Sequence, residues 1–254
     1  MLFDSHAHLD DEKFSQDRYE VINKARESGV SYILNASSDL VSAKNSISLA
    51  EDFEFIYAAV GIHPHCAGEM EDSTLDTVRD LAGHKKVVAI GEIGLDYYYD
   101  TAPRDIQKYW FARQLDLARE LELPVIVHDR DAHEDILDII KSQDLRGVGG
   151  VFHCFSGSVE MAKEVLDNNF YISVSGVVTF KNAKKIIDVV KYTPLDRLLI
   201  ETDCPYLTPE PFRGKRNDSG YVRLVAEKIA SIKGLSFESV ASITLNNARQ
   251  LLSI

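Results

Sequence analysis

Eight short apolar runs recur along this chain of 254 residues, and each is followed by a stretch with helical spacing. Each run is almost continuously apolar, as expected for strands that are buried on both faces of a parallel sheet. The runs span residues 2–6, 31–36, 55–63, 86–92, 123–128, 149–154, 170–176 and 197–203. This repetition limits the chain to folds that alternate strands with helices.

Apolar residues at helical spacing fill the segments between the runs and after the last of them. They predict helices at residues 17–29, 42–52, 73–83, 102–124, 133–143, 158–168, 182–191, 220–234 and 236–252. Eight strands that alternate with helices over this length predict a (β/α)8 TIM barrel, formed by a single domain over residues 1–254. A doubly wound open sheet is the alternative fold.

The charge and cysteine content narrow the classes of protein. A formal net charge of −12 argues against a surface that coats nucleic acid broadly, because phosphate binding draws on Lys and Arg, although a local basic patch remains compatible. Cys66, Cys154 and Cys204 show no disulfide pattern, which favours a reducing compartment. With no signal-peptide pattern and no apolar run of roughly 18 residues, we expect a cytoplasmic protein outside the membrane. No heptad or apolar stripe stands out, so we expect a monomer.

Polar side chains cluster where the predicted strands end. His6 and His8 in "FDSHAHLD" are two residues apart, so they project to the same side at the end of the first strand. The ends of the later runs carry His63, His65, Glu92, His128, His153, Glu201 and Asp203. The carboxyl ends of barrel strands meet at one rim, where active sites lie. His84 and His133 fall elsewhere, and we expect them on the surface.

A rim crowded with imidazoles and carboxylates predicts a metal site, because such groups are costly to bury unpaired. Imidazole ligands suit Zn, Fe, Ni and Mn, whereas carboxylates shift the preference towards Mn and Mg. Six ligands exceed the needs of one open tetrahedral ion. Two ions that share a bridging carboxylate fit better, and such sites serve phosphoester hydrolysis. The chain lacks GxSxG, GxxxxGK[ST] and GxGxxG motifs, which removes the serine-hydrolase, P-loop and Rossmann interpretations.

Several blocks of the sequence resemble those of the TatD family of metal-dependent hydrolases. They are "DSHAHLD", "GIHPH", "GEIGLDYY", "VHDRDA", "HCFSGS" and "ETDCPYLTP…RGKRN", in this order, followed by the closing "TLNNARQLL". The resemblance implies an amidohydrolase-like TIM barrel with its metal site at the carboxyl ends of the strands. It also implies a divalent-metal-dependent DNase, often a 3′→5′ exonuclease.

The resemblance implies roles for individual residues. His6 and His8 would bind one metal ion with Asp203, and Glu92 would bridge to a second ion held by His128 and His153. His63 and His65 would contact the substrate phosphate at the mouth. Other amidohydrolases often place a carboxylated lysine where Glu92 stands, so dihydroorotase-like or phosphotriesterase-like chemistry is disfavoured.

The predicted mechanism uses two divalent ions, expected to be Mg²⁺ or Mn²⁺ with Zn²⁺ as the alternative. Asp203 would act as general base, with Glu92 beside it at the metal centre. His63, His65 and Arg130 would stabilise developing charge on the substrate. Arg216, in a basic loop with Arg213 and Lys215, would contact the substrate, which we expect to be DNA with single-stranded ends.

Two other function classes remain open from sequence. The first is hydrolysis of another ester bond on the same metal centre, such as that of a D-aminoacyl-tRNA. The second is a non-catalytic scaffold on a barrel, which the intact set of predicted ligands disfavours.

Overall fold

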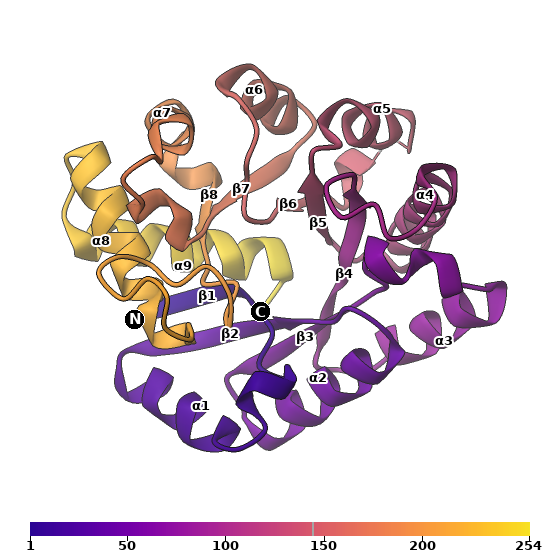
Figure 1. Ribbon diagram of the computed structural model, residues 1–254, viewed down its shortest axis with the longest axis horizontal. Coiled ribbons are helices and arrows are strands. Elements are labelled where there is room, and N and C mark those ends of the chain that lie inside the picture. The colour runs from indigo at the N-terminus through magenta and orange to yellow at the C-terminus, as the bar shows by residue number, and fades with distance from the viewer. Residues whose placement is uncertain (144) are drawn as a thin grey trace.

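Eight parallel strands form the centre of the structure, a computed structural model that describes residues 1–143 and 145–254 (Figure 1). The strands pair in chain order from the first to the eighth. They are β1 (Leu2–Ala7), β2 (Val30–Ala36), β3 (Ile56–Val60), β4 (Val87–Asp96), β5 (Val125–Arg130), β6 (Gly150–Phe152), β7 (Phe170–Val174) and β8 (Leu198–Ile200). The order confirms the TIM barrel and excludes the doubly wound alternative, in which the strand order reverses.

Nine helices surround or close this barrel in the described residues. They are α1 (Arg18–Glu27), α2 (Leu40–Asp52), α3 (Asp72–Ala82), α4 (Arg104–Leu121), α5 (His133–Gln143), α6 (Val159–Asp167), α7 (Lys184–Tyr192), α8 (Val222–Lys233) and α9 (Phe237–Leu252). Each lies where helical spacing predicted it, with ends that differ by a few residues. Figure 1 shows α1 to α8 as an outer ring and α9 inside that ring.

The helix α9 closes the barrel interior at the end away from the strand carboxyl termini. Its Leu245, Ala248 and Leu252 belong to one apolar cluster with inward-facing strand residues such as Phe3 and Leu199. Burying each leucine contributes roughly 1.5–3 kcal/mol. The remaining apolar residues form a second, larger cluster between the strands and the outer helices. The polar rim at the opposite end is therefore the part of the barrel left for chemistry.

The barrel closes between β1 and the segment that follows β8, and this segment contains the predicted site residue Asp203. Ala7 forms a parallel bridge with Cys204, and the N–H of His8 donates to the carbonyl of Cys204 at 2.8 Å. Asp4 reinforces the junction, because its carboxylate accepts from the N–H and the hydroxyl of Thr202 at 2.8 and 2.6 Å. Burial raises the pKa of Asp4 to about 7. These bonds fix the segment after β8 against β1.

Glycines in β4 permit the close strand packing around Glu92. Gly94 has φ +152°, and a Cβ there would lie 1.9 Å from the carbonyl oxygen of His128. A Cβ on Gly91 would lie 2.5 Å from Cβ of Ile126. The sequence "GEIG" thus lets β4 approach β5 closely on both sides of Glu92.

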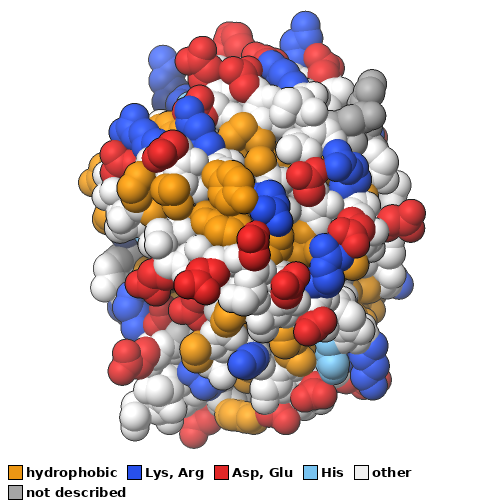
Figure 2. All heavy atoms as spheres, turned by 90° about the vertical axis from the view of Figure 1, so that its right-hand side faces the viewer, with side chains coloured by type: hydrophobic (Ala, Val, Ile, Leu, Met, Phe, Trp, Pro, Cys, Tyr) orange, Lys and Arg blue, Asp and Glu red, His pale blue; other side chains and the backbone are white. Residues whose placement is uncertain are grey.

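The surface carries both signs of charge. On the face in Figure 2, acidic and basic side chains are interspersed, and hydrophobic side chains gather mainly in its upper half. His84 is paired with Glu51 at 3.3 Å, and His133 with Asp129 at 2.7 Å, both outside the rim cluster. The three cysteines are free thiols. Within the described ranges, no helix is long and apolar enough to cross a membrane.

The tight contact of β4 with β5 predicts that Gly94→Ala lowers the free energy of unfolding by at least about 2 kcal/mol, because the added methyl group overpacks the strands. Gly147→Ala is the matched control, since a Cβ there meets nothing within 4 Å. Urea unfolding followed by circular dichroism measures both variants. Equal stability of Gly94→Ala and the native chain would contradict this account of the strand contact.

Candidate metal centre

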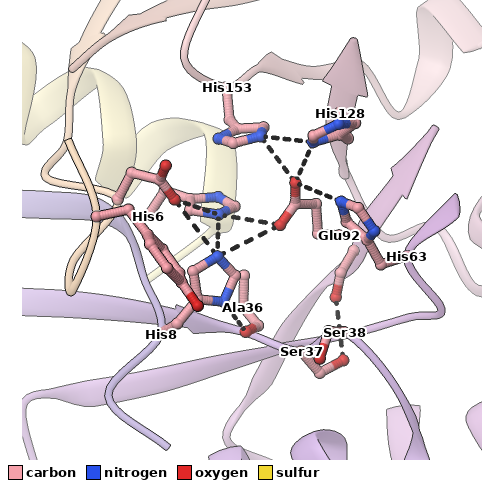
Figure 3. A network of polar contacts seen from close by, with 12 residues as sticks. His6, His8, Ala36, Ser37, Ser38, His63, Glu92, His128 and His153 are labelled. Carbon is pink, nitrogen blue, oxygen red and sulfur yellow. Dashed lines mark hydrogen bonds and ion pairs between the residues drawn. The ribbon is translucent and has the colours of Figure 1, made fainter. Parts of the chain in front are cut away.

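The predicted rim residues converge at the carboxyl ends of the strands, as Figure 3 shows. His6 and His8 come from β1 and the residue just after it, Glu92 from the middle of β4 and His128 from β5. His153 follows β6 directly, and Asp203 lies three residues after β8. The six residues predicted as metal ligands are therefore brought together, from five strands, around the carboxylate of Glu92.

The ligand atoms of His6, His8 and Asp203 form one group, and Glu92 Oε2 lies beside its two histidines. His6 Nε2 lies 3.1 Å from His8 Nε2 and 3.2 Å from Glu92 Oε2. Asp203 Oδ1 lies 3.4 Å from His8 Nε2 and 3.7 Å from His6 Nε2. Ligands about 2.0–2.2 Å from a tetrahedral ion are separated by roughly 3.3–3.6 Å. The spacing of His6, His8 and Asp203 therefore fits one divalent ion, with Glu92 Oε2 within 3.5 Å of both histidines.

The other oxygen of Glu92 faces a second group. Glu92 Oε1 lies 2.6 Å from His128 Nδ1 and 2.8 Å from His153 Nε2, and these two nitrogens are 3.3 Å apart. Each carboxylate oxygen thus serves a different set of imidazoles (Figure 3). This is the arrangement that a carboxylate bridging two ions requires.

His63 lies beside the second group, but its nitrogen nearest to this group carries a hydrogen and so cannot bind a metal ion. Its Nδ1 accepts the backbone N–H of His65 at 3.1 Å, and burial lowers the pKa of His63 to about 4. The neutral ring must therefore carry its hydrogen on Nε2, which lies 3.5 Å from Glu92 Oε1. In this tautomer His63 donates a hydrogen bond, so His128 and His153 are the better ligands for an ion at this position.

Outer groups orient two imidazoles through hydrogen bonds, and a carboxylate lies near a third. His8 Nδ1 donates to the carbonyl of Ala36 at 3.0 Å, which turns Nε2 towards the cluster. His128 Nε2 contacts Asp96 Oδ2 at 3.2 Å, and His153 Nδ1 lies 3.5 Å from Glu201 Oε1. Carboxylates behind histidine ligands are common in metal sites, where they fix the ring and raise its basicity.

The imidazoles around Glu92 have pKa values shifted in both directions. The pKa is raised for His8, His128 and His153 and lowered for His6 and His63. Burial raises the pKa of Glu92, but the neighbouring imidazoles, His153 above all, outweigh it and hold that pKa well below its ordinary value. Burial lowers the pKa of His153, but the charge of Glu92 and the contacts with Glu201 raise it well above its ordinary value. Protons on His8, His128 and His153 thus balance the charge of the carboxylates, as divalent ions would.

Several buried atoms of the cluster lack partners in the part of the chain that the structure describes. His6 Nδ1, His153 Nδ1 and Glu201 Oε2 form no hydrogen bond there. Two aromatic rings of the set, His6 and His153, stack with centroids 3.9 Å apart. Holding so many imidazoles in contact is costly unless a cation binds their nitrogens. The residues present therefore fit the divalent ions that the sequence predicted.

Asp203 occupies a strained backbone position. Its φ of +58° lies in the left-handed region, which costs a non-glycine residue about 1 kcal/mol or more. The conformation is held by a hydrogen bond from its N–H to the carbonyl of His6 at 2.9 Å. The closure of the barrel thus sets the position of this carboxylate at the cluster.

The predicted substrate contacts separate into two groups. His65 lies at the mouth, where its Nε2 contacts Asp96 Oδ2 at 2.8 Å, and Arg130 lies at the end of β5 with its guanidinium over Tyr98. Arg216 instead binds both carboxylate oxygens of Asp17 and lies over the ring of Phe14. It is not among the described residues that line the cavities of the rim.

Asp96 was not predicted to lie at the site, although its position in β4 indicates it. Asp96 follows Glu92 by four residues on a strand that extends past the predicted end of the run, so both side chains point to the same side. The Asp96 carboxylate is buried, and it accepts from the N–H groups of Tyr98 and Tyr99 at 3.0 and 2.8 Å. It thereby links the metal cluster to the mouth.

Two adjoining cavities open at the rim. The first, of about 260 Å³, lies over the metal cluster and is lined in part by His8, Glu92 and Asp203. The second, of about 640 Å³, extends over the ends of β5 to β8. They share His65, His128, His153, Asp203 and Tyr206. A molecule held at the cluster therefore has room to extend sideways into the second cavity.

Comparison with known proteins agrees with this site. The family described as TatD related DNase matches residues 3–253. The uncharacterized metal-dependent hydrolase YabD of Bacillus subtilis is 51% identical over the full length of both chains. The 3′-5′ ssDNA/RNA exonuclease TatD of Erwinia tasmaniensis is 33% identical, also over both full lengths.

Solved structures share the fold. The crystal structure of YjjV, a TatD homologue from Escherichia coli, superposes with a TM-score of 0.94 at 32% identity and covers 100% of this chain and 98% of that one. An uncharacterized amidohydrolase of Saccharomyces cerevisiae gives a TM-score of 0.86 at 20% identity, over 98% and 99% of the two chains, and shows the fold alone.

The barrel and its rim cluster define a metal-dependent hydrolase of the amidohydrolase-like TIM-barrel type. This chain belongs to the TatD family.

Metal addition is expected to stabilise the metal-stripped protein. A ligand present at 100 times its dissociation constant raises the free energy of unfolding by about 2.7 kcal/mol. For a chain of this length, that corresponds to an increase in Tm of roughly 5 °C or more. Because the raised pKa of His153 keeps its proton bound when no ion is present, that proton must leave as the ion binds. The gain should therefore be larger at pH 8 than at pH 6.

Scanning fluorimetry with Mn²⁺ and Zn²⁺ measures this gain. Glu92→Gln should lose most of it, whereas the control Glu20→Gln, on the exposed surface of α1, should retain it. An unchanged Tm on metal addition, or a full gain in Glu92→Gln, would contradict the assignment of the cluster.

Proposed function

We propose that this chain is a divalent-metal-dependent phosphodiesterase that removes nucleotides from the 3′ ends of single-stranded DNA. The observation that carries the proposal is the carboxylate of Glu92, whose two oxygens face two separate imidazole groups. Paired ions at such a carboxylate are typical of enzymes that hydrolyse phosphoesters. The relative from Erwinia tasmaniensis is named a 3′-5′ ssDNA/RNA exonuclease, which supports the choice of substrate.

The residues that would hold the ions follow from the two groups. His6, His8 and Asp203 would bind one ion, His128 and His153 the other, and Glu92 both. When bound, Mg²⁺ or Mn²⁺, or alternatively Zn²⁺, lowers the pKa of water and neutralises charge on a phosphoryl group. The mixture of nitrogen and carboxylate ligands suits these ions.

Asp203 is placed to accept the proton of the attacking water. Burial raises the pKa of Asp203, but the hydrogen bond and charge of His8 outweigh burial and lower it overall, so the carboxylate is ionised at neutral pH. Asp203 lines the cavity over the cluster, where the proposal puts the reacting phosphate. Asp203 is thus the general base of the proposal, with Glu92 holding the reacting groups in place.

In the proposal, three side chains bind the substrate phosphate. His63 presents its Nε2 hydrogen beside the cluster, and His65 and Arg130 line the cavities above it. Hydrogen bonds from these donors stabilise the additional negative charge that develops during attack. The patch is small on a chain of net charge −12, which suits the end of a single strand better than a long duplex.

The proposal predicts cleavage from one end of an oligonucleotide. Metal-stripped protein supplied with Mg²⁺, Mn²⁺ or Zn²⁺ should convert a 5′-labelled single strand into a descending ladder and release label at once from a 3′-labelled strand. Asp203→Asn should lower the rate by about 10²- to 10⁴-fold, because the proton acceptor is lost. Denaturing gels measure both products.

Asp105→Asn, on the exposed first turn of α4, is the control and should cleave like the native chain. Near-normal cleavage by Asp203→Asn would overturn the role of Asp203. If ions bind but no oligonucleotide shortens, DNA is the wrong substrate, and hydrolysis of a D-aminoacyl-tRNA ester is then measured with the same protein.

A further inference from the structure

The larger cavity at the rim has a lining that differs from that of the metal cluster. Its floor is apolar, formed in part by Phe155, Ile186 and Leu207. Phe155 and Ile186 are buried in the barrel rim. At about 640 Å³, the cavity is within the size range of small-molecule sites, which are mostly apolar with a few polar groups. None of the chemistry assigned to the metal cluster uses this floor.

Two tyrosines contribute to the cavity walls from different loops. Tyr99 follows β4 and Tyr206 follows β8, and their exposed fractions are 66% and 43%. Tyr206 is held in place by a hydrogen bond from its hydroxyl to Asp11 at 2.6 Å, and Tyr99 by edge contacts with His65 and Tyr98. Exposed rings beside an apolar floor are suited to stacking with planar groups.

The lining of the cavity carries charges of both signs and also offers groups that read a polar edge. The carboxylates of Asp96, Asp129 and Asp203 line it, and each is paired with a histidine. Arg130 and Lys185 line it, and neither has a carboxylate within 4.0 Å among the described residues. Asn182 and Ser156 also line it, and both are exposed. Free cations here favour an anionic occupant despite the acidic character of the chain.

We propose that this cavity binds the terminal nucleoside of the substrate, whose 5′-phosphate is held at the adjoining metal cluster. The inference rests on the proposed function and adds a subsite to it. The five residues shared by the two cavities make the connection, because a group covalently attached to a phosphate at the cluster extends directly into the larger cavity. The base lies on the apolar floor against the tyrosines.

A nucleoside matches the lining better than an aliphatic acyl group does. Its planar base uses the aromatic walls, its polar edge uses Asn182 and Ser156, and Arg130 and Lys185 attract the 5′-phosphate that it carries. An acyl group would leave these polar and charged groups without a role. The subsite also determines the bond that is cut, which is the one linking the terminal nucleotide to its neighbour.

Two chromogenic diesters test the subsite. Thymidine 5′-(4-nitrophenyl phosphate) and methyl 4-nitrophenyl phosphate share the scissile bond and the leaving group, and only the first carries a nucleoside. The metal-loaded enzyme should favour the thymidine ester by at least about tenfold in kcat/KM, mainly through a lower KM. Ala183→Phe, which fills the cavity from its wall, and Tyr99→Ala should each reduce this preference several-fold.

Tyr192→Ala is the matched control, because Tyr192 is an exposed tyrosine at the end of α7 that lines neither cavity. This variant should keep the native preference for the thymidine ester. Circular dichroism checks that each variant is folded, and Tyr99→Ala serves if Ala183→Phe does not fold. The nucleoside subsite would be overturned if both esters gave equal kcat/KM, or if folded Ala183→Phe or Tyr99→Ala kept the native preference. Either result would leave the proposed phosphodiesterase activity in place. Hydrolysis of neither ester would overturn both.

Discussion

The carboxylate of Glu92 is the group on which the rest of the site depends. It is buried in the barrel, and imidazoles from four segments approach its two oxygens within 2.6–3.5 Å. A buried charge of this kind is tolerated only when it is paired. The charge of this one side chain holds the histidines together. Because its two oxygens face two separate sets of histidines, the cluster can bind two ions.

The barrel provides the geometry that this carboxylate needs. Glycines at positions 91 and 94, before and after Glu92 in β4, allow this strand to approach β5 closely. Hydrogen bonds between β1 and the segment after β8, including those of Asp4 with Thr202, hold Asp203 opposite the histidines of β1. Because α9 closes the other end of the barrel, the rim is where water and substrate meet the cluster.

Much of the fold and of the site was predictable because both depend on periodic features. Continuous apolar runs predicted all eight strands, and histidines at strand ends predicted which side chains converge. Side-chain partners were not predictable. Arg216 binds Asp17 on a distant helix start, which no local pattern indicates, and the proton position on His63 depends on the N–H of His65. Asp96 was missed because β4 runs past the apolar stretch.

Anomalous diffraction from crystals of the Mn²⁺-loaded protein tests the central claim most directly. The account predicts two peaks about 3.5–4 Å apart, one on each side of the Glu92 carboxylate. The first should lie against His6, His8 and Asp203, and the second against His128 and His153. A single peak, or two peaks that do not both contact Glu92, would contradict the bridging carboxylate on which the proposed function is built.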